Sequence, residues 1–241
     1  MTVSAAAAGQ SPAARLRRGA TALKIALGDR QFEQLLDYLA LLHKWNRAYN
    51  LSSVRDAGAM VSRHLLDSLT VAPLLEDLGS DLKRIVDVGS GGGLPGVPLA
   101  IAFPHRHFTL LDSNGKKTRF LFQVKLALGL DNVTIENRRV EHYRPCRRFD
   151  GVISRAFASL DDMTRNCAHL LDDGGRFWAM KGLYPRDELS VVEKHYKVEG
   201  CHQLRVPESE AERHLLILAP FDGRLNGAGL PGAGQRAENE G

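Results

Sequence analysis

The stretch from Ile85 to Ala100, IVDVGSGGGLPGVPLA, contains two overlapping glycine patterns that are typical of nucleotide-binding loops. Counted from Asp87 it reads D-x-G-x-G-x-G, which is typical of S-adenosylmethionine sites. Counted from Gly91 it reads G-x-G-x-x-G, which is typical of dinucleotide sites. The two patterns use different glycines, so the position of the preceding strand decides between them.

The predicted strand RIVDV favours the first pattern. In a doubly wound sheet the ligand binds beyond the carboxyl ends of the strands, so the binding loop starts where the first strand ends. Gly89 follows RIVDV directly, and Gly89, Gly91 and Gly93 then form the turn. Pro95 would interrupt the second pattern. Because proline is tolerated in the first turn of a helix, we expect a helix to begin near Leu94.

Asp112 ends a second apolar run, FTLLD, about 20 residues after the glycines. A carboxylate at this point can accept paired hydrogen bonds from the two hydroxyl groups of a ribose. S-adenosylmethionine and NAD both contain such a ribose. Asp112 therefore predicts a nucleoside site without choosing between the cofactors.

Short β-branched runs alternate with helical stretches from Lys83 onward. Strands are expected at RIVDVG, HFTLLD, NVTIEN, FDGVIS and GRFWAMKG, and helical segments are expected to begin near Leu94, Gly115, Val140 and Asp161. This alternation predicts βαβ units and a parallel sheet that is buried on both faces. Apolar stretches at 198–206 and 214–220 could add a closing hairpin.

Helical periodicity precedes the sheet. Apolar residues recur every three or four positions from Gln31 to Tyr49, and a second helix is expected from Asp56, as its N-cap, to about Leu69. Trp45 and Tyr49 lie on the apolar face of the first helix, which favours core packing over base stacking. The predicted organisation is a disordered tail at 1–14, a helical region at 15–80, an α/β domain at 81–221 and a disordered tail at 222–241.

The charged residues are distributed unevenly. Residues 81–160 contain 13 Lys and Arg against 7 Asp and Glu, whereas the whole chain has a net charge of +4. Such a region attracts polyanions, although a solvated surface gives the same count. The cysteines and histidines form no recognisable metal motif, so no metal site is expected. Because we find neither a membrane-spanning apolar run nor a secretory signal, we expect a cytoplasmic protein.

Six motifs together closely resemble one family. They are, in chain order, LHKWNRAYNLSSVRD, RHLLDS, DVGSGGGLPGVPLAI, FTLLDSNGKKTRFL, FDGVISRAFASL and MKG. This combination is similar to the ribosomal RNA small subunit methyltransferase G family, formerly glucose-inhibited division protein B, over about residues 20–220. The resemblance implies a class I S-adenosylmethionine-dependent methyltransferase, Rossmann-like, with a mostly parallel seven-stranded sheet and an N-terminal helical addition. It also implies methyl transfer to N7 of a guanine in 16S rRNA, at position 527 in standard rRNA numbering.

The resemblance assigns cofactor contacts to individual residues. They fall on Gly89 and Leu94 in the first loop, on Val140 and Glu141 after the third strand, and on Arg155 after the fourth. Arg155 then lies beside both the methionine end of the cofactor and the target base, as a candidate for positioning them. Because N7 of guanine carries no proton, we expect no obligatory general acid or base, and catalysis through positioning.

Basic residues near the predicted crevice are the candidates for RNA binding. They are Lys44, Arg47, Arg55, Arg63 and His64 in the helical region, and Arg138, Arg139 and Lys181 near the sheet. Phosphate contacts from such residues would anchor the RNA while the crevice selects the base. A solvated helix face explains the first group equally well. The expected partner is 16S rRNA, in the small subunit or in an assembly intermediate, and the protein is expected to be a monomer.

Two other functions remain open at the level of the sequence. An NAD-dependent oxidoreductase would use the pattern that begins at Gly91, but we find no proton relay of His or Tyr with Lys, and the downstream motifs stay unexplained. An RNA-binding assembly factor would keep the fold without methyl transfer. The intact glycine loop and Asp112 argue against that alternative.

Overall fold

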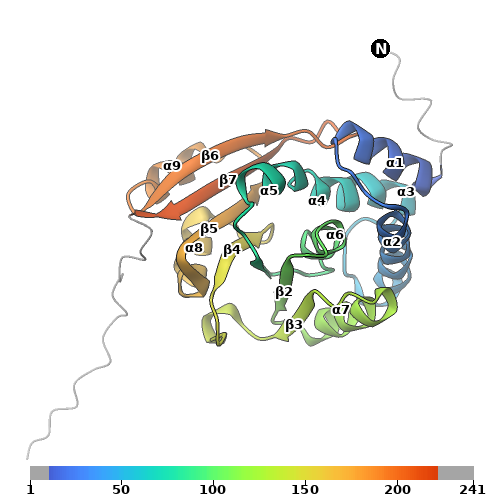
Figure 1. Ribbon diagram of the computed structural model, residues 1–241, viewed down its shortest axis with the longest axis horizontal. Helices are drawn as coiled ribbons and strands as arrows, with labels where there is room; N and C mark the ends of the chain where they lie inside the picture. Colours follow the sequence, from blue (N-terminus) through green and yellow to red (C-terminus); the bar gives the residue numbers. More distant parts are fainter. Residues whose placement is uncertain (1–10, 222–241) are drawn as a thin grey trace, which may run out of the picture.

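A single seven-stranded sheet organises residues 11–221, the part of the chain that this computed structural model describes (Figure 1). Its strands are β1 (Arg84–Val88), β2 (His107–Asp112), β3 (Val133–Asn137), β4 (Phe149–Ser154), β5 (Leu171–Lys181), β6 (Tyr196–Leu204) and β7 (Arg213–Pro220). Their order is β3-β2-β1-β4-β5-β7-β6. Strands β1 to β5 pair in parallel, and β7 is antiparallel to both of its neighbours. The predicted mostly parallel sheet and its closing hairpin are confirmed.

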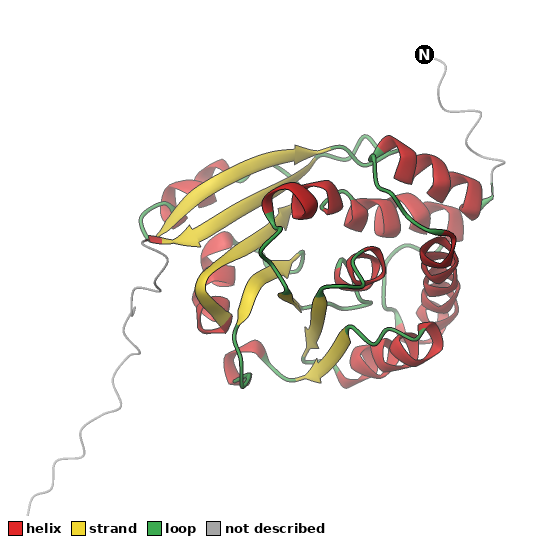
Figure 2. Ribbon diagram, in the orientation of Figure 1, coloured by secondary structure: helices red, strands yellow, loops and turns green. Residues whose placement is uncertain are grey.

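Helices lie on both faces of this sheet, as Figure 2 shows. They are α1 (Pro12–Ala22), α2 (Asp29–Tyr49), α3 (Ala57–Met60), α4 (Asp67–Leu69), α5 (Ala72–Leu78), α6 (Gly96–Ala102), α7 (Gly115–Leu128), α8 (Leu160–Cys167) and α9 (Arg186–Val192). A π-helical turn, η1 (Val61–Leu66), joins α3 to α4. The 3₁₀ turns η2 (Val140–His142) and η3 (Ala168–Leu170) flank β4 and α8.

Two apolar cores lie on opposite faces of the sheet. On one face, alternate strand residues such as Phe108 and Trp178 pack against the N-terminal helices, α6 and α7. On the other, residues such as Val86 and Phe177 pack against α8 and α9. The first core runs from Leu16 to Ile217, so the helical region shares its core with the sheet. The predicted boundary at residue 80 falls between α5 and β1 and stays a prediction.

The N-terminal helices largely follow the predicted pattern. Asp56 is the N-cap of α3, with its Oδ1 accepting from the N–H of Ala59 at 2.7 Å. The predicted tail at 1–14 is wrong in its last residues, because α1 begins at Pro12 and Ser11 caps it. Residues 1–10 and 222–241 lie outside the described residues.

The two aromatic residues of α2 differ in their surroundings. The ring of Trp45 lies 5.6 Å from that of Phe120 and packs against the first core. Tyr49 stacks on Trp45 with 5.1 Å between ring centroids but is 45% exposed. The expectation of core packing is therefore confirmed for Trp45 and wrong for Tyr49, because α2 extends beyond the core at its C-terminal turn.

The connection between β3 and β4 does not form the expected helix near Val140. It contains only the three-residue turn η2, followed by an irregular segment that includes Pro145. Proline cannot continue a helix, and the segment is too short for a second helical start. As a result no helix among residues 11–221 covers β3 on the second face. The expectation of a sheet buried on both faces is therefore wrong for β3, which is only half-buried after Val133, and for His107, whereas β2 is buried from Phe108 onward.

Candidate active site

The loop after β1 turns on three glycines. Gly89, Gly91 and Gly93 have positive φ values of 73°, 60° and 91°, a backbone region that residues with a Cβ rarely adopt. At Gly89 an added Cβ would also lie 2.7 Å from the Cβ of Ala156. The turn therefore follows the pattern that begins at Asp87.

Gly96, the last glycine of the competing pattern, belongs to α6 instead. Its N–H donates to Oδ2 of Asp87 at 2.8 Å, and an added Cβ would lie 2.7 Å from the same oxygen. Gly96 thus lets the helix approach the strand closely. The helix begins there, with Pro95 as its N-cap, slightly later than the expected start near Leu94.

Asp87 is fully buried at the end of β1. Its Oδ1 has no hydrogen-bond partner anywhere in residues 11–221. Burial raises the pKa of this carboxyl to about 7, and the nearby Asp112 carboxylate raises it too, whereas the Gly96 N–H and Arg155 oppose the shift. A buried acceptor without a donor costs free energy, so a ligand amino group at this point would be stabilising.

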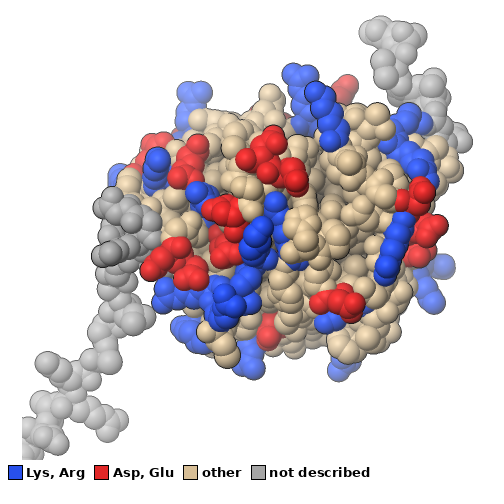
Figure 3. Space-filling model, viewed as in Figure 1, with Lys and Arg blue, Asp and Glu red and all other residues tan. Residues whose placement is uncertain are grey.

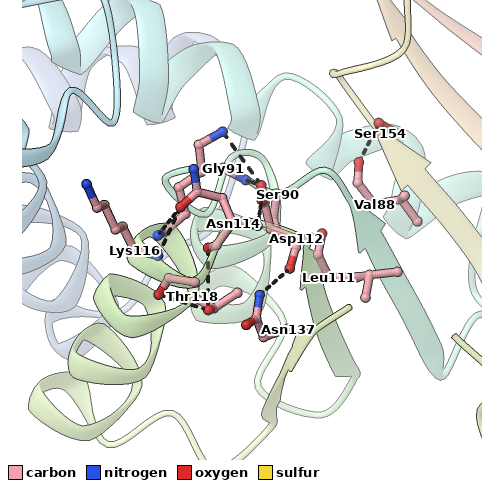
Figure 4. Close-up of polar contacts among 12 residues, drawn as sticks. Val88, Ser90, Gly91, Leu111, Asp112, Asn114, Lys116, Thr118, Asn137 and Ser154 are labelled. Atoms are coloured by element: carbon pink, nitrogen blue, oxygen red, sulfur yellow. Dashed lines mark hydrogen bonds and ion pairs between the residues drawn. The ribbon is translucent and has the colours of Figure 1, made fainter. Parts of the chain in front are cut away.

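Asp112 joins the glycine turn to the end of β2 (Figure 4). Its Oδ2 accepts from the N–H of Gly91 at 2.9 Å, and its Oδ1 accepts from the N–H of Asn114 at 2.8 Å. The Nζ of Lys117 lies 3.8 Å from Oδ2. Each carboxylate oxygen can accept a second hydrogen bond, so the side chain can hold the turn and still bind a ribose.

Val140 and Glu141 come to the same edge of the sheet through β3. Asn137 lies opposite Asp112 in the parallel register, and its side-chain amide donates to the main-chain oxygen of Asp112 at 3.1 Å. Three residues later, Val140 packs half-buried against the second core, while Glu141 is exposed. The glycine turn, Asp112 and this pair thus follow three neighbouring strands.

Arg155 follows β4 and is held by a buried carboxylate. The Oγ of Ser154 donates to the main-chain oxygen of Val88 at 2.7 Å, which fixes β4 beside β1 (Figure 4). Nη1 of Arg155 lies 2.7 Å from Oδ2 of Asp67, and Nε of Arg213 lies 2.6 Å from Oδ1. The Asp67 side chain is 1% exposed, whereas those of Arg155 and Arg213 are 29% and 31% exposed.

A cavity of about 810 Å³, here called the Arg155 cavity, opens beside this triad. It is bounded by η1 and its flanks, by the end of β5 and by the β6–β7 connection. Its lining includes Arg63, His64, Asp67, Arg155, Lys181 and Arg213. The cavity therefore lies at the carboxyl ends of β4 and β5, where a doubly wound sheet binds its ligands.

Other polar contacts fix the walls of the Arg155 cavity. Nζ of Lys181 lies 2.9 Å from Oε1 of Glu188. Nε2 of His64 lies 2.6 Å from Oγ of Ser52, and burial lowers the pKa of this histidine. His64 is therefore mostly neutral near pH 7, and it is as much a packing residue as a cavity residue.

The β6–β7 connection is tied to α1, which lies beside it in Figure 1. Glu208 accepts from Nε of Arg15 at 2.7 Å and from Nη2 of Arg18 at 2.5 Å. These contacts join residues that are 193 and 190 positions apart in the sequence. They hold one wall of the Arg155 cavity against the N-terminal helix.

Three of the RNA-binding candidates, Arg63, His64 and Lys181, line the Arg155 cavity. Arg55 instead binds the end of α2, where its guanidinium donates to the main-chain oxygen of Asn46 at 3.2 Å and to the side chain of Asn50 at 2.6 Å. Arg55 thus has a structural role in the described fold.

The remaining candidates lie outside the Arg155 cavity. Lys44 and Arg47 are exposed on α2. Arg138 and Arg139 are exposed just after β3, and Arg138 lines a different cavity. The predicted set is therefore spread over three parts of the surface.

Sequence reasoning missed Asp67, which binds Arg155, and Arg213, which binds the same carboxylate. Asp67 lies within the RHLLDS motif, so a signal for it was present, although the motif alone gave it no role. Arg213 is 146 residues from Asp67 along the chain, and no local pattern distinguishes it from other surface arginines.

Residues 11–221 contain no group of three or more His, Cys, Asp or Glu that could hold a metal ion. Among the helices in that stretch, none is long and apolar enough to cross a membrane. The cysteines are free thiols, and burial raises the pKa of Cys167 to about 12.

Comparison with known proteins identifies the family. Residues 31–216 match the family described as rRNA small subunit methyltransferase G. The chain belongs to this family. It is therefore an S-adenosylmethionine-dependent methyltransferase.

Curated relatives in the rRNA small subunit methyltransferase G family are similar over nearly their whole length. A protein of that name from Cellvibrio japonicus is 59% identical over 206 residues, which cover 86% of this chain and 94% of the relative. One from Stutzerimonas stutzeri is 56% identical over 209 residues, covering 87% and 96%. The match thus includes both the helical region and the sheet.

Solved structures support the fold of the family. The N-methyltransferase NodS from Bradyrhizobium japonicum, in complex with S-adenosylhomocysteine, has a TM-score of 0.53 at 10% identity and covers 73% of this chain and 97% of its own. The glycopeptide N-methyltransferase MtfA has a TM-score of 0.53 at 11% identity, covering 64% and 90%. The class I methyltransferase fold is confirmed.

Proposed function

We propose that this enzyme transfers the methyl group of S-adenosylmethionine to N7 of a guanine in 16S rRNA of the small ribosomal subunit, at position 527 in standard rRNA numbering. The observation that carries the proposal is the position of the Arg155 cavity. It lies at the carboxyl end of β4, and β4 pairs with β1, whose end carries the glycine turn. A cofactor on the turn and a base in the cavity are then neighbours, in a chain of the methyltransferase G family.

The residues present fit S-adenosylmethionine. We assign its binding to the glycine turn and to three strand ends, through Gly89, Gly91, Gly93, Leu94, Asp112, Val140, Glu141 and Arg155. The unpartnered Oδ1 of Asp87 supports this assignment, because the methionine amino group of the cofactor carries the donors that this oxygen lacks. The positive φ values of Gly89, Gly91 and Gly93 also support the assignment, because a turn without Cβ atoms lets a ligand approach the backbone.

The cofactor supplies a sulfonium-activated methyl group, so the chain has only to position the acceptor. N7 of guanine has an exposed lone pair and no proton, so no residue needs to act as a general base. Arg155 and Arg213, fixed by Asp67, present guanidinium donors to the cavity, and guanine offers its O6 acceptor next to N7. Holding the reacting atoms in line contributes on the order of several kcal/mol to such a reaction.

The cavity also constrains the RNA. N7 lies in the major groove, which is deep and narrow in A-form RNA and closed to most side chains. The target guanine must therefore lie in a loop or an irregular junction. Arg63, His64 and Lys181 line the cavity and are the nearest of the proposed RNA contacts, with Lys44, Arg47, Arg55, Arg138 and Arg139 farther out.

The proposal extends to the working form of the enzyme. We propose that it acts as a monomer in the cytoplasm, on the small subunit or on an intermediate of its assembly. Residues 15–80 would supply one wall of the Arg155 cavity and residues 81–221 the cofactor site. The shared first core supports a fixed arrangement of the two.

Mapping the modified nucleotide tests this function. Methylation at N7 leaves the imidazole ring cationic, so borohydride reduction followed by aniline should cleave 16S rRNA at one guanine, and only after incubation with S-adenosylmethionine. A methyl mark on a ribose 2′-oxygen, or on N1 or N2 of guanine, would overturn the proposal, because those atoms must lose a proton to a base. Tighter binding of NADH than of S-adenosylhomocysteine in isothermal titration would overturn the cofactor assignment.

A further inference from the structure

A second cavity, of about 510 Å³, lies on the face of the sheet that the missing helix leaves open. We call it the Arg84 cavity. Its floor comes from β1, β2 and β3, and its rim comes from the segment after η2. The lining includes Arg84, Thr109, Glu136, Arg138, Arg144 and Arg147.

The strands beneath the Arg84 cavity have polar residues where a doubly wound sheet would bury apolar ones. On β2, His107 and Thr109 share a face with Leu111, which belongs to the second core. On β3, Thr134 and Glu136 occupy the corresponding positions. Parallel strands buried on both faces are apolar throughout, so these sequences are adapted to a polar surface.

The arginines of the Arg84 cavity are held mainly by neutral groups. Arg84 donates to the main-chain oxygens of Arg147 at 3.2 Å and Arg148 at 3.3 Å. Arg144 donates to the main-chain oxygens of Glu141 at 2.9 Å and Tyr143 at 3.1 Å. Carbonyl groups orient a guanidinium without neutralising it, so both side chains keep their positive charge.

Glu136 is the single carboxylate in the lining, against four arginines. It lies 3.7 Å from Nε of Arg138, whose side chain is 62% exposed, so this ion pair is a weak one. Figure 3 shows Lys and Arg side chains gathered at the lower left, over the β3–β4 connection. Four of the 13 Lys and Arg side chains of residues 81–160 thus line this cavity.

We propose that the Arg84 cavity binds phosphate groups of the RNA that carries the target guanine. The inference rests on the proposed function and deepens it, because it names a phosphate-docking site apart from the Arg155 cavity. Guanidinium groups donate to phosphate oxygens in paired geometry, and such contacts position an RNA without reading its sequence. The excess of cations over carboxylates favours a polyanion over an apolar or basic protein surface.

The site also joins RNA docking to the cofactor edge. Val140 and Glu141 of η2 lie on the same connection as Arg138, Arg144 and Arg147, between β3 and β4. An RNA strand bound through its phosphates in the Arg84 cavity would therefore lie next to the cofactor pocket, while the target base enters the Arg155 cavity. Because Arg84 and His107 begin β1 and β2, this substrate would extend from the amino ends of these strands to the carboxyl end of β4.

Charge reversal with a matched control tests this site. The double variant Arg138→Glu/Arg147→Glu is compared with Arg186→Glu/Lys194→Glu, which changes the net charge equally at exposed positions in and after α9, near the opposite edge of the sheet. Binding to unmethylated 16S rRNA transcribed in vitro, and to small subunits assembled from it, is measured by filter binding at several salt concentrations. We expect the first variant to bind about tenfold more weakly and its salt slope to fall by about one to two, since each neutralised phosphate contributes about 0.7–0.9.

Three further measurements keep the outcome clear. The control variant should bind RNA as the wild type does. Equal losses of RNA affinity in both double variants would overturn the proposal. An unchanged salt slope in the Arg138→Glu/Arg147→Glu variant would overturn it as well. If the Arg138→Glu/Arg147→Glu variant has a lower thermal midpoint than the wild type, Arg147→Ala is measured in its place. The salt slope of RNA binding is then expected to fall by about one. Methyl transfer by the wild type tests the proposed function separately, because a wild type without transfer refutes that function while its RNA binding still tests the cavity.

Discussion

The Arg155 and Arg84 cavities are both rich in arginine, but different groups hold their arginines. In the Arg155 cavity, one buried carboxylate binds Arg155 and Arg213 at 2.7 Å and 2.6 Å. In the Arg84 cavity, main-chain carbonyls orient Arg84 and Arg144. The first arrangement fixes geometry and offsets part of the charge, whereas the second leaves the whole charge of each arginine available.

This difference matches the needs of the two parts of an RNA substrate. A base undergoing methyl transfer needs hydrogen-bond donors in fixed positions. A phosphate needs positive charge and tolerates a looser geometry, because its oxygens are equivalent and its contacts are partly exchangeable with solvent. Carboxylate-bound arginine thus suits chemistry, and carbonyl-bound arginine suits docking.

Of the substitutions considered, replacing Asp67 should have the largest effect, because it removes the group that holds both arginines of the Arg155 cavity. Asp67→Asn removes the charge that pairs with both Arg155 and Arg213. We expect the free energy of unfolding to fall by about 3 kcal/mol, near the low end for breaking a buried ion pair because both arginines are partly exposed. Urea denaturation measures this loss. Single-turnover methyl transfer should fall with it, and a variant of wild-type stability and rate would refute the role given to Asp67.

Replacing Arg155 should remove activity while leaving the fold intact. In Arg155→Ala the carboxylate of Asp67 keeps Arg213 as its partner, so the thermal midpoint should change little. Methyl transfer should fall by about 100-fold or more, which corresponds to about 2.7 kcal/mol of transition-state stabilisation. Arg155→Lys is the matched control, because it keeps the charge but loses the planar fork, and it should recover only part of the rate. Full activity in Arg155→Ala would remove this residue from the site.

Asp112 extends the comparison between charged and main-chain partners, because here main-chain N–H groups hold a carboxylate. Asp112→Ala should weaken S-adenosylhomocysteine binding by about 1.5–3 kcal/mol in isothermal titration, if the carboxylate accepts charge-assisted hydrogen bonds from a ribose. Because the same oxygens bind Gly91 and Asn114, Asp112→Asn is needed to separate the two roles. It keeps an acceptor for one N–H and should lose less affinity. Unchanged binding in a folded Asp112→Ala variant would exclude Asp112 from the cofactor site.

Local patterns predicted most of the elements and the glycine turn. The run RIVDV correctly predicted where β1 ends. The glycines that follow it have the positive φ values that the first pattern requires. Asp56 as an N-cap and the closing hairpin were also predictable, because each depends on a few neighbouring residues.

Features that depend on distant residues were not predictable. The triad of Asp67, Arg155 and Arg213 joins three segments that only the folded sheet brings together. The helix expected near Val140 failed for a local reason, since Pro145 interrupts a short connection and its apolar residues are few. The alternating polar residues of β2 and β3 were the available signal that this part of the sheet stays uncovered.

The hydrogen bond that Asp112 accepts from the Gly91 N–H has a consequence for turnover. It exists within the protein alone, so it orders the glycine turn when the chain folds and not each time a ligand binds. If the turn holds the cofactor as proposed, product departure and cofactor entry would require no reordering at this hydrogen bond. The free energy of each binding event remains available to distinguish S-adenosylmethionine from its demethylated product.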